Sequence, residues 1–170
     1  MAGEPEFVQC SDFGCKTQVG LDLSQDQWQN IVSIFSTPAA NALVEKQQIR
    51  QSIALMEQYT GEISGTWQDK GENYTGQDLP HQQDCIDEST NTFQYLYALE
   101  KRGLLKWHSV QGKLRRIVWF FSHWTAVIRD LSDQQLYAVD SWYRDNGEPP
   151  YIQKLDDWKA KKPFPVALNP

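Results

Sequence analysis

The chain lacks an excess of positive charge. Lysine and arginine number 16 against 22 aspartate and glutamate residues, which gives a net charge of −6 at pH 7. This balance excludes a general nucleic-acid binder, because such proteins present a basic surface. No apolar run reaches the length of a membrane span. Residues 1–12 also lack the basic and apolar regions of a secretion leader, so we expect the chain to begin near a mature amino terminus.

Cysteine is scarce, with three residues in 170. Cys10 and Cys15 lie close together in a polar segment that contains glycine, and this spacing predicts a small disulfide loop. Such a bond indicates an oxidising compartment and leaves Cys85 as a free thiol. The alternative is that Cys10 and Cys15 are unpaired surface cysteines of a cytosolic protein.

Aromatic residues, in contrast, are plentiful. Seven tryptophans favour a deep interior lined by aromatic rings, and the length of 170 residues predicts one domain, residues 1–170. The expected order is an irregular arm over 1–22, helices over 24–60, a core over 65–143 and a tail over 144–170 that wraps the core.

The helical region reads as two helices. Ser24 is placed to cap the first, and Pro38 is well placed as the first residue of the second, which we expect to end before Gly61. The stretch from Gly61 to Gln83 is long for a loop inside a compact domain, and such loops are usually functional or disordered. We therefore interpret it as one wall of a cleft, with Trp67, Gln68 and Tyr74 as lining residues.

A central helix is predicted to start at Cys85. Asp84 is a good N-cap, and Asp87 has capping-box spacing to it. Gly103 provides the signal for the end of the helix. A thiol on the first turn is stabilised as the thiolate, because the free amides there carry partial positive charge. The alternative is an inert Cys85 that is buried as a small apolar residue.

The pattern then changes to strands. We predict a short strand over 106–110, a turn over 111–113, a long strand over 117–129 and a returning antiparallel strand over 136–142. The long strand is apolar on both alternating faces, from Trp119 and Phe121 on one to Phe120 and Trp124 on the other, which predicts cover on both sides.

His123 lies on the long strand and Asp140 on the returning one. Closure of the turn near Ser132 places the two side chains opposite each other or one diagonal apart, within hydrogen-bond reach. A carboxylate there favours the cationic imidazole, which in turn stabilises a thiolate. The alternative is a pair that only satisfies core polarity. His81 and His108 are expected to be solvated.

With these residues placed, the chain resembles the bacterial transglutaminase-like cysteine peptidases of the papain-like superfamily. The matching segments are Gln83-Asp84-Cys85-Ile86-Asp87-Glu88-Ser89, Ser122-His123-Trp124-Thr125-Ala126-Val127 and Tyr137-Ala138-Val139-Asp140. The resemblance covers about residues 65–143. It implies an α+β papain-like fold, in which amino-terminal helices and the helix that bears the cysteine pack on an antiparallel sheet.

The resemblance implies a role for each member of the triad. Cys85 is the nucleophile, His123 the general base and acid, and Asp140 the carboxylate that orients the ring. The Cys85 amide receives the oxyanion together with a second donor that the sequence does not identify. The residues expected to contact the substrate or the oxyanion are Trp67, Gln68, Gln83, Trp124 and Trp142.

Members of the resembled family can also bind calcium beside the active site. Asp84, Asp87 and Glu88 supply the oxygen ligands that calcium favours. Ordinary capping of the helix explains Asp84 and Asp87 without a metal, so no cofactor is required and calcium is an option.

The leading hypothesis is a thiol hydrolase that forms a thioester acyl-enzyme on a peptide or amide substrate. Its expected partners are a protein or peptide substrate, with neither nucleic acid nor a membrane span. A periplasmic or secreted bacterial protein is implied by the resemblance and agrees with a disulfide between Cys10 and Cys15. The alternatives are acyl transfer to an amine, or a non-catalytic binding module on the same fold.

Overall fold

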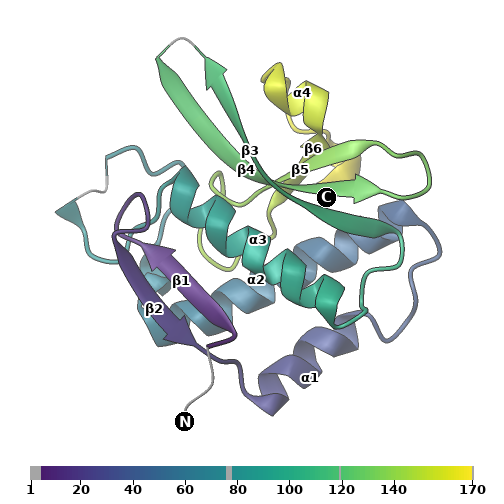
Figure 1. Ribbon diagram of the computed structural model, residues 1–170, viewed down its shortest axis with the longest axis horizontal. Helices are drawn as coiled ribbons and strands as arrows, with labels where there is room; N and C mark the ends of the chain where they lie inside the picture. Colours follow the sequence, from purple (N-terminus) through teal and green to yellow (C-terminus); the bar gives the residue numbers. More distant parts are fainter. Residues whose placement is uncertain (1–4, 76–77, 119, 170) are drawn as a thin grey trace.

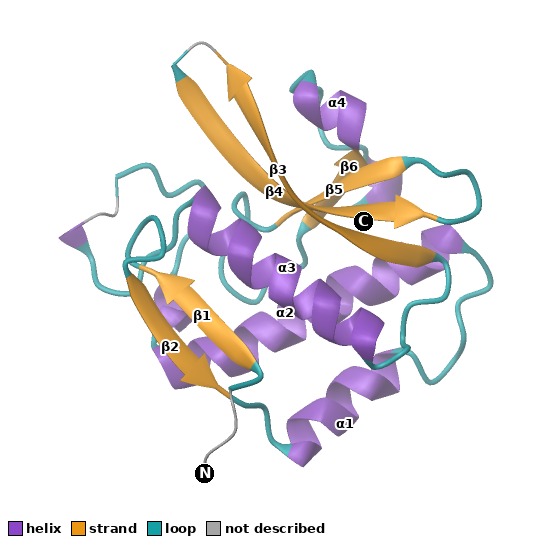
Figure 2. Cartoon of the chain, viewed as in Figure 1, coloured by secondary structure: helices purple, strands orange, loops and turns teal. Residues whose placement is uncertain are grey.

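The computed structural model describes residues 5–75, 78–118 and 120–169 and has the predicted mixed α+β class (Figures 1 and 2). Its strands are β1 (Phe7–Ser11), β2 (Thr17–Leu21), β3 (His108–Val118), β4 (Phe121–Asp130), β5 (Leu136–Asp140) and β6 (Tyr151–Lys154). Its helices are α1 (Gln25–Ile34), α2 (Ala42–Ser64), α3 (Cys85–Lys101) and α4 (Leu155–Lys159), with short 3₁₀ helices at Thr66–Gln68 and Val166–Leu168. No helix among the described residues is long and apolar enough to cross a membrane.

The main sheet has four antiparallel strands in the order β3-β4-β5-β6. α3 lies between this sheet and the separate hairpin of β1 and β2, α2 also packs against α3, and α1 packs against α2 (Figure 2). The principal core joins apolar residues from all these layers, including Ile31, Ile53, Leu96, Ile128 and Ile152.

Helix α3 forms for the local reasons read from the sequence. The Asp84 side chain accepts from the Asp87 amide and the Asp87 side chain accepts from the Asp84 amide, which completes a capping box. One side of the helix is buried in the core, where Leu96 and Leu99 are fully covered. The helix ends just before Gly103, whose φ of +69° continues the chain in the left-handed region.

The prediction of an irregular arm over 1–22 is wrong, because β1 and β2 form an antiparallel hairpin there. Long-range contacts hold it. Asn91 of α3 accepts from the Cys10 amide and donates to its carbonyl, and Gln94 does the same at Val8. The short apolar pattern of the segment could not report contacts made by residues more than 70 positions away.

The boundaries of α2 also differ from the prediction. It starts at Ala42, where the Asn41 side chain accepts from the Val44 amide, and not at Pro38. It continues through Gly61 and ends with Gly65 in the left-handed region at φ +88°. Gly61 allows α2 to lie close to Asn146, because a Cβ at position 61 would lie 2.9 Å from the side-chain nitrogen Nδ2 of Asn146.

The predicted turn at 111–113 is a bulge within β3. Register shifts between Val110 and Gly112, and β3 continues to Val118 before the chain reverses. The expected burial of the long strand holds for its inner half, where Ala126, Val127 and Ile128 are covered from both faces. It is wrong at the outer end, where Phe120 and Phe121 are 97% and 76% exposed. Trp119 lies outside the described residues.

The tail over 144–170 does more than wrap the core. β6 pairs with β5 and becomes the far edge of the sheet, and Trp158 of α4 is fully buried. The expectation that His108 is solvated is also wrong. His108 is 2% exposed, and its Nδ1 lies 2.9 Å from the Glu45 carboxylate of α2, which gives this buried imidazole a polar partner.

Candidate active site

A cleft of about 650 Å³ opens beside the amino terminus of α3. Cys85 and His123 lie in its wall together with Ser122. Aromatic residues from five separate segments of the chain form part of the remaining wall, beside polar and charged residues that include Arg116, Lys161 and Lys162. These rings belong to Phe13, Tyr74, Phe121, Trp142, Tyr143 and Phe164. The cleft therefore combines a potential nucleophile with a surface that suits apolar or aromatic groups.

Cys85 is the first residue of α3 and the one free cysteine of the chain. Its side chain is partly exposed and its sulfur lies 4.0 Å from the Ser122 carbonyl. The Asp84 side chain accepts from the next two amides, those of Ile86 and Asp87. Among the described residues the Cys85 amide itself has no hydrogen-bond acceptor, so it can donate to an oxyanion that forms at the sulfur.

The sheet brings His123 and Asp140 together. In the β4–β5 register Ala126 faces Val139, which places Asp140 one diagonal from His123. His123 Nε2 lies 2.7 Å from Asp140 Oδ2. Because Asp140 occupies Nε2, Nδ1 is the ring nitrogen left for Cys85.

The surroundings of His123 favour its charged form. Burial opposes a charge on the ring, but hydrogen bonds to Asp140 and Cys85, with the charges of those groups, raise the pKa of His123 to about 9. His123 is therefore an imidazolium at neutral pH, next to the cysteine. This is the arrangement that stabilises a thiolate.

Trp158 is a member of this network that the sequence did not reveal. Its indole Nε1 donates to Asp140 Oδ2 at 2.7 Å, so one carboxylate oxygen serves both rings. Arg116 lies over the Trp158 ring and donates to the Trp158 carbonyl and, at 2.8 Å, to the Tyr143 hydroxyl. Arg116 lies directly opposite His123 in the register of β3 and β4. A correct position for the β3–β4 turn would have predicted that pairing.

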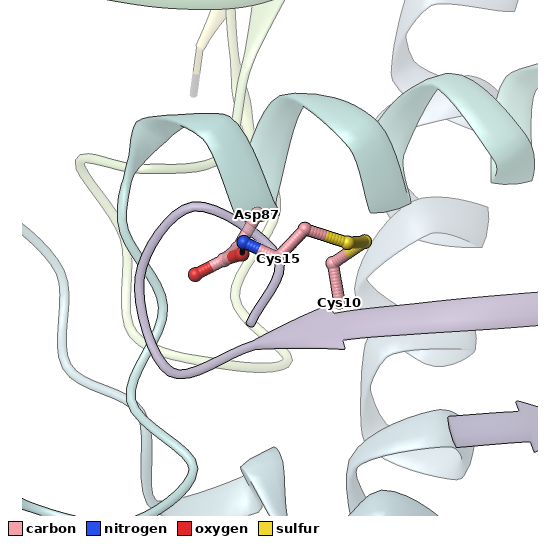
Figure 3. Close-up of side chains that lie close together, drawn as sticks. All are labelled: Cys10, Cys15 and Asp87. Carbon is pink, nitrogen blue, oxygen red and sulfur yellow. Dashed lines mark hydrogen bonds between the residues drawn. A yellow bond between two sulfur atoms is a disulfide. The ribbon is translucent and has the colours of Figure 1, made fainter. Parts of the chain in front are cut away.

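A disulfide organises the loop next to the first turn of α3. Cys10 and Cys15 are bonded (Figure 3), and Asp12, Phe13 and Cys15 of this loop adopt positive φ. This backbone form directs successive amides to one side. The Phe13 and Cys15 amides donate to the two oxygens of Asp87, at 2.9 and 2.5 Å. The loop thus anchors the capping residue of the helix that carries Cys85, and it places Phe13 in the cleft.

Buried carboxyl groups lie on the other side of the same helix turn. Burial raises the pKa of Glu57 to about 8 and that of Asp69 to about 6, and it raises the pKa of Glu88 well above its usual range. A protonated Glu88 donates to Asp69, and Asp69 accepts from the Gln83 amide at 2.8 Å. This cluster joins α2 and α3 to the loop that carries Tyr74 into the cleft.

The three carboxylates expected as calcium ligands do not converge. The Asp84 oxygen and both Asp87 oxygens accept from backbone amides, and Glu88 is buried against Asp69. Within the described residues, the group of three potential ligands found within 4.8 Å of one another is Cys10, Cys15 and Asp87, whose sulfurs are joined to each other. Calcium needs roughly six to eight oxygen ligands, so these residues do not fit it.

The expected lining residues divide into two groups. Trp142 and Tyr74 line the cleft and meet edge to face at 4.7 Å. Trp67 and Gln68 are exposed outside it. Gln83 is buried and its side chain donates to the Cys10 carbonyl.

Trp124 also lies away from the cleft. It is on the opposite face of β4 from His123, beside Lys113 and Arg115. Adjacent residues of a strand point to opposite faces, so the sequence alone indicates that Trp124 and His123 lie on different sides of the sheet.

Comparisons of the chain with protein-family models, with curated proteins and with solved structures find no match. The chemical interpretation therefore depends on the geometry of the cleft.

We predict that Asp140→Asn lowers the pKa of His123. Burial stays in place while the opposing charge is lost, so the pKa falls from about 9 by about 1 to 3 pH units. An NMR titration of the imidazole measures it. Asp156→Asn, which removes an exposed carboxylate from α4, is the control and leaves the value in place. A His123 that still titrates near 9 in Asp140→Asn contradicts the assignment.

We further predict that stability declines as the pH rises between 4.5 and about 8, the usual and the native pKa of Glu57. In this range the native protein keeps a proton that the unfolded chain releases, so unfolding becomes easier. Glu57→Gln cannot ionise and shows a shallower decline in urea unfolding. Glu62→Gln, an exposed position on the same helix, keeps the wild-type slope. Parallel curves for Glu57→Gln and wild type refute the prediction.

Proposed function

We propose that this protein is a thiol hydrolase that acts on peptide or amide bonds, with Cys85 as nucleophile, His123 as general base and acid, and Asp140 as orienting carboxylate. The observation that carries the proposal is the continuous chain from Asp140 through His123 to a helix-terminal thiol at the wall of an aromatic cleft. The resemblance to bacterial transglutaminase-like cysteine peptidases, with their papain-like fold, supports the same assignment.

The reaction follows from the geometry. The proton of the Cys85–His123 pair lies on His123, and the Cys85 sulfur attacks the carbonyl carbon, so that a carbon–sulfur bond forms and an oxyanion develops near the Cys85 amide. When the oxyanion collapses, the carbon–nitrogen bond breaks and the leaving amine takes the proton from His123. Water, which loses its proton to His123, then cleaves the thioester. An amine in place of water gives acyl transfer.

The proposed place of action is outside the cytoplasm, in the periplasm or in the secreted fraction. The bond between Cys10 and Cys15 supports it, because disulfides persist in oxidising compartments and are rare in the cytosol.

We predict that His123→Ala slows alkylation of Cys85 by iodoacetamide about tenfold or more near neutral pH, since the thiolate loses its cationic partner. Cys85 is the one free cysteine, so intact mass reports its modification directly. His81→Ala, which removes an exposed imidazole from the loop before α3, keeps the wild-type rate. Equal rates in wild type and His123→Ala would instead favour a non-catalytic binding module with an inert thiol.

A further inference from the structure

The β3–β4 hairpin carries a charge opposite to that of the whole chain. From His108 to Arg129 the hairpin has four lysine or arginine residues and no aspartate or glutamate, while the net charge of the protein is −6. The outer end of the hairpin also projects beyond the rest of the sheet (top of Figure 1). Positive charge is thus concentrated on a projecting element and can act on a partner without interference from the acidic remainder.

The face of this hairpin that is opposite to Arg116 is basic. Lys113 and Arg115 alternate there with exposed side chains, and both lie near the Trp124 ring, at 5.6 and 5.7 Å from its centroid. Lys113 also donates to the Thr90 hydroxyl of α3 at 2.7 Å. Within the described part of the chain neither cation has a carboxylate partner. Arg116, on the inner face, is instead engaged with Trp158 and Tyr143 and belongs to the site.

The end of the hairpin is apolar. Ile117 is 63% exposed and Phe120 is 97% exposed. Large apolar side chains this exposed at the tip of a projecting element are unusual on a soluble surface and mark an interaction site. Ile117 is two strand residues beyond Arg115, about 7 Å along β3. The distance along the strand from Arg115 and Trp124 to the apolar tip is therefore similar to the depth, about 5–10 Å, to which interfacial segments enter a bilayer.

We propose that this surface, formed by Lys113, Arg115, Ile117 and Phe120, docks on an anionic lipid bilayer. Lys113 and Arg115 meet the negative headgroups, Trp124 lies at the interface, and Ile117 and Phe120 enter the acyl region. Phe121 and Ser122, which follow directly, line the cleft. Docking therefore places the opening of the cleft next to the lipid surface, and this role is independent of the chemistry proposed for Cys85.

The test is sedimentation of the full chain with phosphatidylcholine vesicles that contain or lack phosphatidylglycerol. We expect binding only to the anionic vesicles and weaker binding at high salt. Phe120→Ser and Arg115→Glu each reduce the partition constant for anionic vesicles about tenfold. Val166→Ser, which removes an apolar side chain that is 79% exposed elsewhere, and Lys154→Glu, on the far edge strand β6, retain wild-type binding.

The substituted residues Arg115, Phe120, Lys154 and Val166 do not line the cleft. Each variant should therefore show the wild-type rate of Cys85 alkylation, and this rate reports that the variant is folded. Absence of binding to anionic vesicles overturns the proposal. Binding that depends on Arg115 but not on Phe120 also overturns it, because that result indicates adsorption by charge alone, without entry of the hairpin tip into the acyl region. A wild-type protein whose Cys85 is not alkylated would refute the hydrolase proposal. The vesicle result does not depend on that outcome.

Discussion

The amino-terminal turn of α3 is the constraint on which the candidate site depends. Asp84 and Asp87 cap each other's amides, and among the described residues the Cys85 amide of this turn has no acceptor. Asp87 is in turn held by the amides of the disulfide loop. One buried side chain therefore links the β1–β2 hairpin, the helix dipole and the thiol. Displacement of that turn would move the nucleophile and its oxyanion donor together.

The second requirement is a place where a charged imidazole is stable in a largely buried setting. Asp140 provides it, and the network continues beyond the pair because Trp158 donates to the same carboxylate oxygen that faces His123. A buried carboxylate with two donors is better compensated than one with a single donor. The tail of the chain thus contributes to the site through α4 although it has no residue in the triad.

The parts that the sequence predicted are those determined locally or by register. The start and end of α3 follow from Asp84, Asp87 and Gly103, and the proximity of His123 and Asp140 follows from a short hairpin connection. The β1–β2 hairpin was missed because contacts from Asn91 and Gln94 hold it, and the β3–β4 turn was misplaced because Gly112 signals a bulge as readily as a turn. Trp158 was missed because no spacing connects an indole in the tail to Asp140.

The central claim is that Cys85 is an activated nucleophile that turns over, and the most direct measurement is the intact mass of the protein during reaction with p-nitrophenyl acetate. The account predicts a single acetyl adduct on Cys85 that water or an added amine removes, and that is absent from Cys85→Ser and strongly reduced in His123→Ala. The amine dependence distinguishes transfer from hydrolysis. A wild-type protein that acquires no more acetyl than Cys85→Ser would contradict the account.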